Sequence, residues 1–316
     1  MNRRDAVRLL AAMPATRVLG HSFGPAREPR FVERWSWAMG QPVHVQAYVP
    51  DEDHGLEAIA AALRELREVE SQLSLFDDAS DLSELNRCAG TGPVRVGYHL
   101  RAALGVAIRV RDRTGGAFDP AVEPLLRAWG FRSPRAAPPD AATLADARAA
   151  VRAAVVRFDR AGVTLAGSAS RLDLGGIGVG YGLDRIGSVL RSRGVTSALL
   201  DMSGDLLALG APPGEAGWRV ALVEPDGTRH ARGAVVTLRD NALATSANTV
   251  EVVRYGALAV GHVLDPRRGD AAHALRQVAV VARSAVMADA LSTAALVGGH
   301  EVVGGDARIV RAWRLA

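Results

Sequence analysis

Apolar residues recur at helical or strand spacing through most of the chain after residue 30. Residues 55–73 place an apolar side chain every three or four positions with charges opposite, which predicts an amphipathic helix. Its apolar positions are Leu56, Ile59, Leu63, Leu66 and Leu73. Residues 99–116 repeat the pattern and end in two glycines, which favours a helix C-terminus there.

Three later segments also have helical character. Residues 133–154 predict a loop followed by a polar, alanine-rich helix, and a helix carrying Leu183 is expected to stop at Gly194. Residues 284–299 predict the last helix. Short apolar runs that predict strands occupy residues 44–49, 155–159, 162–167, 195–201, 218–224, 233–238 and 277–283.

The order of these elements indicates the fold class. Strands and helices are mixed without the strict alternation of a parallel α/β fold, so we predict an α+β protein. The chain of 316 residues shows no internal repeat and no change of composition that marks a linker. We therefore expect one domain over residues 31–316, preceded by a leader or disordered segment over residues 1–30.

The leader begins with Arg3-Arg4 and a short apolar run, as a weak twin-arginine export signal does. Arg8 and Arg17 interrupt that run, so a helical or disordered N-terminus without an export role is the alternative. The first hypothesis predicts a periplasmic protein or one at the outer face of the inner membrane, and the second a cytoplasmic one. No later segment is long and apolar enough to span a bilayer.

Charge composition excludes some chemistry. The chain contains no lysine, so neither a Schiff base nor a Walker-type lysine on a phosphate is available. Its arginines are scattered rather than gathered in a basic stripe with aromatic residues, so the net charge of +4 does not indicate a nucleic-acid partner. The single cysteine, Cys88, excludes an intramolecular disulfide and a cysteine metal cluster.

The glycine-rich run Asp173–Arg185 raises the question of a dinucleotide site. Glycines precede a helix, a strand follows, and Asp201 lies at the end of that strand, as in a Rossmann fingerprint. However, no placement of G-x-G-x-x-G fits the run. Arg171 and Asp173 also stand where a buried parallel strand would be apolar. The pattern therefore disfavours a Rossmann fold.

Three oxygen-bearing side chains share one face of the last predicted helix. Asp289, Ser292 and Thr293 stand at positions i, i+3 and i+4, and all are ligands that Mg²⁺ accepts. One carboxylate is little charge for a divalent ion unless substrate phosphates complete the shell. From the spacing alone, surface groups or hydroxyls bonded to the helix backbone are the stronger interpretation.

Two other polar residues stand at the ends of predicted elements. His262 precedes an apolar pair and a turn, where a histidine serves either as a general base or as a structural residue. Asp119 lies between a turn and a buried segment, as a helix cap or as a ligand contact.

Taken together, eight segments resemble the ApbE family of FAD:protein FMN transferases, in family order. The resemblance covers nearly the whole chain after the leader and implies a single ApbE-like, T-fold-like domain with mixed or antiparallel sheets flanked by helices. The matching segments are AMGQPVHV, LSLFDDASDLSELN, GGAFDPAVEPLLRAWGF, DLGGIGVGYGLDR, MSGDLLALG, ATSAN, GHVLDPRRG and ADALSTA.

The resemblance implies Mg²⁺-dependent transfer of FMN from FAD to a threonine or serine hydroxyl of a partner protein, with release of AMP. By the same resemblance, His262 is the general base. The implied metal positions are Gly176 (by its carbonyl), Asp289, Ser292 and Thr293. The implied FAD contacts are Met39, Phe76, Ala117, Phe118, Asp119, Asp173 and Leu264. The implied acceptor belongs to a membrane-associated electron-transfer complex.

Several positions depart from the family pattern. Val179 stands where a lysine or glutamate is usual, Gln41 and Arg268 replace threonines, and Ala247 replaces a glycine. Ser292 is neutral where some members carry a second acid. Val179 and Arg268 motivate one alternative, an FAD-binding carrier without transfer. A second alternative is a side activity of the same site, an FAD pyrophosphatase that uses water as the acceptor.

Overall fold

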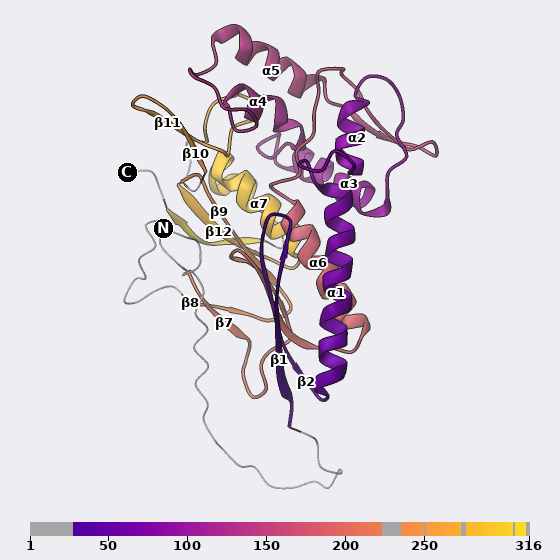
Figure 1. The fold of residues 1–316 in the computed structure, drawn as a ribbon. Helices are drawn as coiled ribbons and strands as arrows, with labels where there is room; N and C mark the ends of the chain where they lie inside the picture. The colour runs from indigo at the N-terminus through magenta and orange to yellow at the C-terminus, as the bar shows by residue number, and fades with distance from the viewer. Residues whose placement is uncertain (1–27, 223–234, 250, 273–275, 306, 314–316) are drawn as a thin grey trace.

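A computed structural model describes residues 28–222, 235–249, 251–272, 276–305 and 307–313 (Figure 1). Most of the expected leader, residues 1–27, lies outside the described residues. Within them no helix is long and apolar enough to cross a membrane.

The centre of the molecule is an antiparallel sheet of seven strands in the order β1–β2–β5–β6–β9–β12–β13. The strands are β1 (Arg30–Ala38), β2 (Gln41–Val49), β5 (Ser197–Met202), β6 (Asp205–Leu209), β9 (Ala242–Ala247), β12 (Gln277–Ala282) and β13 (Arg308–Trp313). Three hairpins accompany it: β3 (Val156–Phe158) with β4 (Val163–Leu165), β7 (Trp218–Ala221) with β8 (Val235–Leu238), and β10 (Val252–Tyr255) with β11 (Leu258–Gly261).

Helices α1, α6 and α7 pack on the sheet, and α2 to α5 gather at one end of the molecule (Figure 1). The helices are α1 (Glu52–Leu73), α2 (Asp81–Arg87), α3 (Tyr98–Arg113), α4 (Glu123–Ala128), α5 (Ala141–Ala153), α6 (Gly178–Ser192) and α7 (Ala285–Gly298). Two 3-10 helices, η2 (Pro120–Val122) and η3 (Gly299–Val302), precede α4 and follow α7, respectively.

Both faces of the central sheet are apolar and covered, because successive side chains of a strand point to opposite faces. Leu200 of β5 belongs to the core formed with α1, α6 and α7, whereas the adjacent Leu199 belongs to a second core beneath the β7–β8 hairpin. A third core, which includes Phe118 and Leu264, fills the end with α2 to α5. The sheet and the helices together confirm the predicted α+β class.

The sequence patterns predicted most of the helices but only some of the strands. The predicted helices are confirmed as α1, α3, α5, α6 and α7. The elements that were not predicted are α2, α4, β1, β6, β9, β10, β11 and β13. One face of β1 carries exposed aromatic residues such as Trp35 and Trp37, so the usual alternation of apolar and polar positions is hidden. Strand β5, after the glycine-rich run, is antiparallel to both neighbours, which excludes the parallel Rossmann arrangement.

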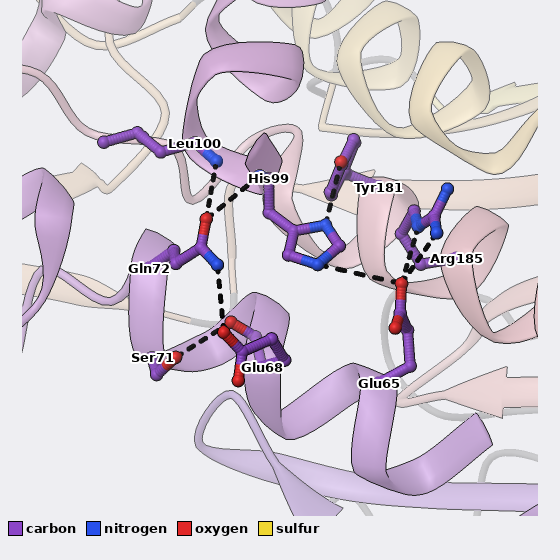
Figure 2. Close-up of polar contacts among 8 residues, drawn as sticks. All are labelled: Glu65, Glu68, Ser71, Gln72, His99, Leu100, Tyr181 and Arg185. Atoms are coloured by element: carbon purple, nitrogen blue, oxygen red, sulfur yellow. Dashed lines mark hydrogen bonds and ion pairs between the residues drawn. The ribbon is translucent and has the colours of Figure 1, made fainter. Parts of the chain in front are cut away.

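A buried polar junction fastens α6 to α1 and α3 (Figure 2). The Tyr181 hydroxyl lies 3.1 Å from Nδ1 of His99, and Nε2 of His99 lies 3.7 Å from Glu65. Arg185, one turn after Tyr181, donates to the same Glu65 carboxylate at 2.9 and 2.7 Å. Burial lowers the pKa of His99 and raises that of Tyr181 to about 12. The junction therefore orients the helix that starts at the glycine-rich run.

Candidate active site

The glycine-rich run enters α6 where it meets the last helix, α7. A Cβ atom on Gly176 would lie 3.1 Å from Oγ1 of Thr293 and 3.4 Å from Cε2 of Phe118. Because no side chain intervenes, the backbone at Gly176 approaches both residues closely. Three of the predicted site residues, far apart in sequence, therefore lie together.

A second glycine places Asp289. The N–H of Gly180 donates to Oδ2 of Asp289 at 2.9 Å, and a Cβ on Gly180 would lie 2.8 Å from the Asp289 Cβ. Asp184, one turn further along α6, accepts from the backbone N–H groups of Ala285 and Val286 at the start of α7. Close packing and capping thus fix the start of α7 on α6.

Hydroxyl groups from β9 and α7 form the next part of the site. Oγ of Ser246 lies 2.6 Å from Oγ of Ser292 and 3.4 Å from Oγ1 of Thr293. The Ser292 hydroxyl, fully buried, also donates to the carbonyl of Asp289 at 2.9 Å. Ser292 is therefore bonded to its own helix backbone, whereas Thr293 is half-buried beside Gly176.

Two carboxyl groups, the buried Asp289 and the half-buried Asp205, define the electrostatics of the site. Burial raises the pKa of Asp289 to about 7. Burial, together with the charge of Asp289, holds the pKa of Asp205 on β6 well above its ordinary value. Asp205 accepts from the backbone N–H of Thr245 at 3.1 Å, next to Ser246. Such a pair is costly to ionise without a nearby cation.

These groups fit a hard cation. Carboxylate, hydroxyl and backbone carbonyl oxygens are the ligands of Mg²⁺, and the buried carboxyl group of Asp289 would gain from a positive charge. Among the described residues no three His, Cys, Asp or Glu side chains converge as a ready-made metal cluster. A cation here would therefore also need the oxygens of Gly176, Thr293 and a bound substrate.

On the other side of the glycine-rich run, Asp173 joins an aromatic group. Arg132 forms an ion pair with Asp173, and its guanidinium lies 5.4 Å from the centre of the Phe76 ring. Oδ1 of Asp173 also accepts from Gly175 N–H at 2.7 Å. Phe76 is 84% exposed, so its ring is free to stack on a planar ligand.

The segment that carries Ala117, Phe118 and Asp119 lies beside Asp173. The backbone N–H of Asp173 donates to the carbonyl of Pro120 at 2.7 Å. Asp119 caps η2 by accepting from Ala121 N–H at 2.9 Å, which is the cap role allowed by the sequence, and burial raises its pKa.

Met39 lies at the turn of the β1–β2 hairpin, which faces α6. Its backbone has a positive φ of 53° and its N–H donates to Glu70 at 2.7 Å. A Cβ on Gly178 would lie 3.3 Å from the methyl group of Met39, and one on Gly182 would lie 3.4 Å from its sulfur. Met39 therefore lies against the first turns of α6.

Asn248, at the end of the ATSAN segment, holds Val263, the residue between His262 and Leu264. His262, half-buried, follows β11 directly and donates its backbone N–H to Glu251 at 3.0 Å. Oδ1 of Asn248 accepts from Val263 N–H at 2.9 Å, and its Nδ2 donates to the Val263 carbonyl at 3.2 Å. Leu264, the next residue, is buried in the core that also contains Phe118.

The departures from the family pattern lie in different environments. Val179 is half-buried and packs against the core shared by the sheet, α1 and α6. Arg268 is exposed and pairs with Asp270 at 3.0 Å. Gln41 and Ala247 are half-buried, the first opening β2 and the second ending β9.

Five residues of the site were not found from the sequence. Arg132, Asp184, Asp205, Ser246 and Asn248 each contact a predicted residue or the segment that carries one. Asp205, Ser246 and Asn248 fall in the matched segments MSGDLLALG and ATSAN, which is the signal that could have found them. Asp184 falls in the matched segment DLGGIGVGYGLDR, which gives the same signal. Arg132 lies just outside the matched segments and gave no local signal, because its partner Asp173 is distant in sequence.

Comparison with known proteins identifies the family of this chain. The model of the ApbE family matches residues 39–304. An FAD:protein FMN transferase of Treponema pallidum is 34% identical over 264 residues, which cover 77% of this chain and 73% of that protein. One from Vibrio cholerae is 29% identical over 244 residues, covering 75% and 72%.

Solved structures agree. The ApbE protein of Thermotoga maritima matches with a TM-score of 0.75 and 26% identity, covering 86% of this chain and 88% of that one. The flavinyl transferase ApbE of Pseudomonas stutzeri, in its apo form, also has a TM-score of 0.75 and 26% identity, with coverage of 87% and 88%.

The α+β fold and the relatives together define a class of enzyme, the transferases. The chain belongs to the ApbE family. The resemblance stated from its eight segments is thereby confirmed.

Proposed function

We propose that this enzyme transfers FMN from FAD to a threonine or serine hydroxyl of a partner protein in an Mg²⁺-dependent reaction. The hydroxyl oxygen bonds to the phosphorus on the FMN side of the diphosphate, and the bond from that phosphorus to the bridging oxygen breaks. AMP leaves with the bridging oxygen, and the hydroxyl proton passes to a base. The observation that carries this proposal is the cluster of Gly176, in the turn before α6, with Asp289 and Thr293 of α7.

Asp289, Thr293 and the carbonyl of Gly176 would hold Mg²⁺. The ion would neutralise the charge of the diphosphate oxygens. Ser292 belongs to the same predicted set, and its hydroxyl is already engaged with Ser246 and the Asp289 carbonyl. Within this proposal Ser292 chiefly orients Ser246, which in turn lies within 3.4 Å of Thr293.

His262 would take the proton from the acceptor hydroxyl. A neutral imidazole is suited to this role near pH 7. Asn248 fixes the backbone just after His262 by three hydrogen bonds, to Val263 and to the carbonyl of Ala272. This anchoring supports a reproducible position of the base, which proton transfer requires.

The FAD contacts would come from the other predicted residues. Phe76 offers an exposed ring for stacking, and Asp173, held by Arg132, offers a carboxylate for ligand N–H or O–H groups. Ala117, Phe118 and Asp119 lie beside Asp173 through the Pro120 contact. Met39 and Leu264 supply apolar contacts from the hairpin turn and from the segment after His262.

The test is fluorescence of a protein band on a denaturing gel. Purified enzyme is incubated with FAD, Mg²⁺ and candidate acceptors encoded by neighbouring genes, and a covalently flavinylated acceptor is expected to fluoresce. Asp289→Ala and His262→Ala should abolish or strongly reduce the band. Asp146→Ala, at an exposed position on α5, is the control and should not change it.

Other products would identify the alternatives. Free FMN and AMP formed without any acceptor would indicate an FAD pyrophosphatase, and intact FAD retained after Mg²⁺ and acceptor are added would indicate a carrier. Either result, with no fluorescent band for any acceptor, would contradict the proposal.

We further propose that the reaction takes place at the outer face of the inner membrane, on a subunit of an electron-transfer complex. The support is the Arg3-Arg4 pair of the leader, which lies outside the described residues. A fusion of the full chain to a reporter that is active only after export tests this, with Arg3→Gln/Arg4→Gln as the matched control. A reporter that stays inactive in both would place the enzyme in the cytoplasm.

A further inference from the structure

One face of strand β1 exposes three large aromatic side chains, with Glu33 on the same face between the first and the second. Phe31 is 46% exposed, Trp35 66% and Trp37 68%. Their odd numbers place them on the same face, opposite the buried Val32 and Ala38. We call these three residues the aromatic strip. Single exposed apolar residues are ordinary, but three large rings on one face of one strand, with Trp35 and Trp37 as neighbours, indicate a contact surface.

The strip lies on an open sheet edge. β1 is the terminal strand of the central sheet and, among the described residues, pairs only with β2. Its nine residues contain no proline, and the register with β2 is unbroken. Natural proteins usually protect such edges with proline, bulges or cover, because a free edge readily accepts another strand.

The neighbouring part of the same face is already covered. Trp218 of the β7–β8 hairpin belongs to the core that contains Leu199 and Leu243 of the central sheet. Tyr48 marks the border, because its ring lies 6.0 Å from Trp218 on one side and 5.2 Å from Phe31 on the other. The strip is thus the part of this face that the hairpin leaves open.

Trp35 of the aromatic strip is held in place by a residue of β2. The Trp35 ring stacks on His44 of β2 with ring centres 3.8 Å apart and an angle of 8° between the planes. His44 in turn bonds to Glu33 at 2.8 Å. A pre-arranged aromatic surface loses little side-chain entropy when a partner binds.

The strip leads to the active site. Trp37 is two residues before Met39, whose side chain lies against Gly178 and Gly182 of α6. At about 3.4 Å per residue, Trp35 stands about 14 Å and Phe31 about 27 Å from the turn. Figure 1 shows the turn of the β1–β2 hairpin close to α6, in agreement with the contacts of Met39. A chain lying along β1 would therefore deliver its end to the site.

We propose that the aromatic strip and the β1 edge dock the acceptor protein, through an extended segment next to the hydroxyl that receives FMN. This inference rests on the proposed function, because it takes the acceptor of FMN to be a protein. Apolar side chains at alternate positions would contact the strip while the segment adds a strand to β1. Arg30 and Arg34, exposed at intervening positions of β1, favour acidic residues in that segment.

The test separates docking from chemistry. Trp35→Thr and Trp37→Thr, singly and together, keep a strand-forming residue while removing the ring. Flavinylation rates are measured against the concentration of the purified acceptor that gives the fluorescent band with the wild-type enzyme. We expect the double variant to raise KM for the acceptor about tenfold or more, with kcat at saturating acceptor nearly unchanged.

Three further measurements complete the design. FAD affinity, from equilibrium dialysis, and the thermal midpoint are expected to match the wild-type enzyme. Phe158→Thr removes another exposed strand aromatic, on β3, and is expected to leave KM unchanged. Hydrogen exchange of the β1 amides is expected to slow when the acceptor is added.

Two results would overturn the inference while leaving the proposed function intact. One is an acceptor KM in the double variant equal to that of the wild type. The other is a wild-type dimer that the double variant converts to monomer with no change in KM, which would assign the strip to a second copy of the chain. If the wild-type enzyme flavinylates no acceptor, the proposed function fails and the docking assignment fails with it.

Discussion

The backbone N–H of Gly180 and the carboxylate of Asp289 are 2.9 Å apart, and this contact joins the first turn of α6 to α7. It uses an N–H group at a helix N-terminus, which has no partner within its own helix. The absence of a side chain at Gly180 permits the approach, since a Cβ would also meet the carbonyl of Ala285. The position of the carboxylate therefore depends on a glycine 109 residues away in sequence.

The variant Gly180→Ala should separate the two helices. The added methyl group would overlap the backbone of Ala285 and the Cβ of Asp289, so we expect a loss of about 1–3 kcal/mol in the free energy of unfolding. Flavinylation should fall with it, because Asp289 would shift. Urea denaturation and the gel assay measure both effects.

Gly105→Ala is the matched control for that substitution. Gly105 lies within α3, and a Cβ there would meet only the tip of Arg109 at 3.6 Å. The change should stabilise the protein by about 0.4–1 kcal/mol and leave activity unchanged. Equal effects of the two variants would contradict the packing argument.

Mg²⁺ binding should strengthen as pH rises through neutrality. Burial raises the pKa of Asp289 to about 7, so below that pH the metal competes with a proton for the carboxylate. Without metal, the raised pKa stabilises the fold at low pH, and that contribution is lost as pH rises through 7. Calorimetric titration with Mg²⁺ between pH 6 and 8 should show proton release, and Asp289→Asn should remove it.

Arg132→Ala should weaken FAD binding. Asp173, 7% exposed, would lose its ion-pair partner, and the Phe76 ring would lose the guanidinium beneath it. A charge-assisted hydrogen bond contributes about 1.5–3 kcal/mol, so the dissociation constant for FAD should rise roughly tenfold or more. Equilibrium dialysis measures this change.

Arg268→Ala is the control for that arginine, because its pair with Asp270 is largely exposed and worth about 0–1 kcal/mol. The same variant shows whether this departure from the family pattern affects activity. A dissociation constant for FAD that Arg132→Ala leaves unchanged would rule out the assigned role of Asp173 and its arginine.

Asn248→Ala should impair the reaction through the segment that carries His262. The substitution removes the hydrogen bonds to Val263 and Ala272, at an expected cost of about 1–3 kcal/mol. At a temperature where the variant remains folded, kcat should fall more than FAD affinity. Asn241→Ala, which removes a single bond to Arg239 N–H, is the control. Comparable losses of kcat in both variants would argue against a specific anchor.

His99 should make stability depend on pH. Burial lowers its pKa, so the unfolded chain binds a proton more readily than the folded one. The stability due to neutral His99 is therefore complete above about pH 6.5, its ordinary pKa, and is lost as pH falls towards the lowered value. Unfolding free energies between pH 7.5 and 5 should decline less steeply for His99→Gln than for the wild-type protein, with the exposed His54→Gln as control.

The family and the elements with a clear apolar period can be predicted from the sequence without knowledge of the fold. Helix α1 is predicted by the amphipathic spacing of residues 55–73, and the family is indicated by short motifs such as the runs around Asp173 and Asp289. Both signals are local, because helix formation and short motifs depend on neighbours along the chain. The ordered set of eight segments determined which side chains to consider, among them His262 and Thr293. It also gave Asp119 as a possible cap, which the structure bears out.

The tertiary structure alone decided which of these groups meet and in what environment. Contacts between segments distant in sequence include the ion pair of Arg132 with Asp173 and the hydrogen bond between Ser246 and Ser292. The raised pKa values of Asp205 and Asp289 likewise result from burial in the folded chain. Strand β1 was not predicted because its exposed aromatic face breaks the expected alternation of apolar and polar residues. Only the packing shows that this face is left uncovered. Burial and long-range contact are properties of the folded chain, because they depend on which surfaces exclude water together, and no local pattern contains them.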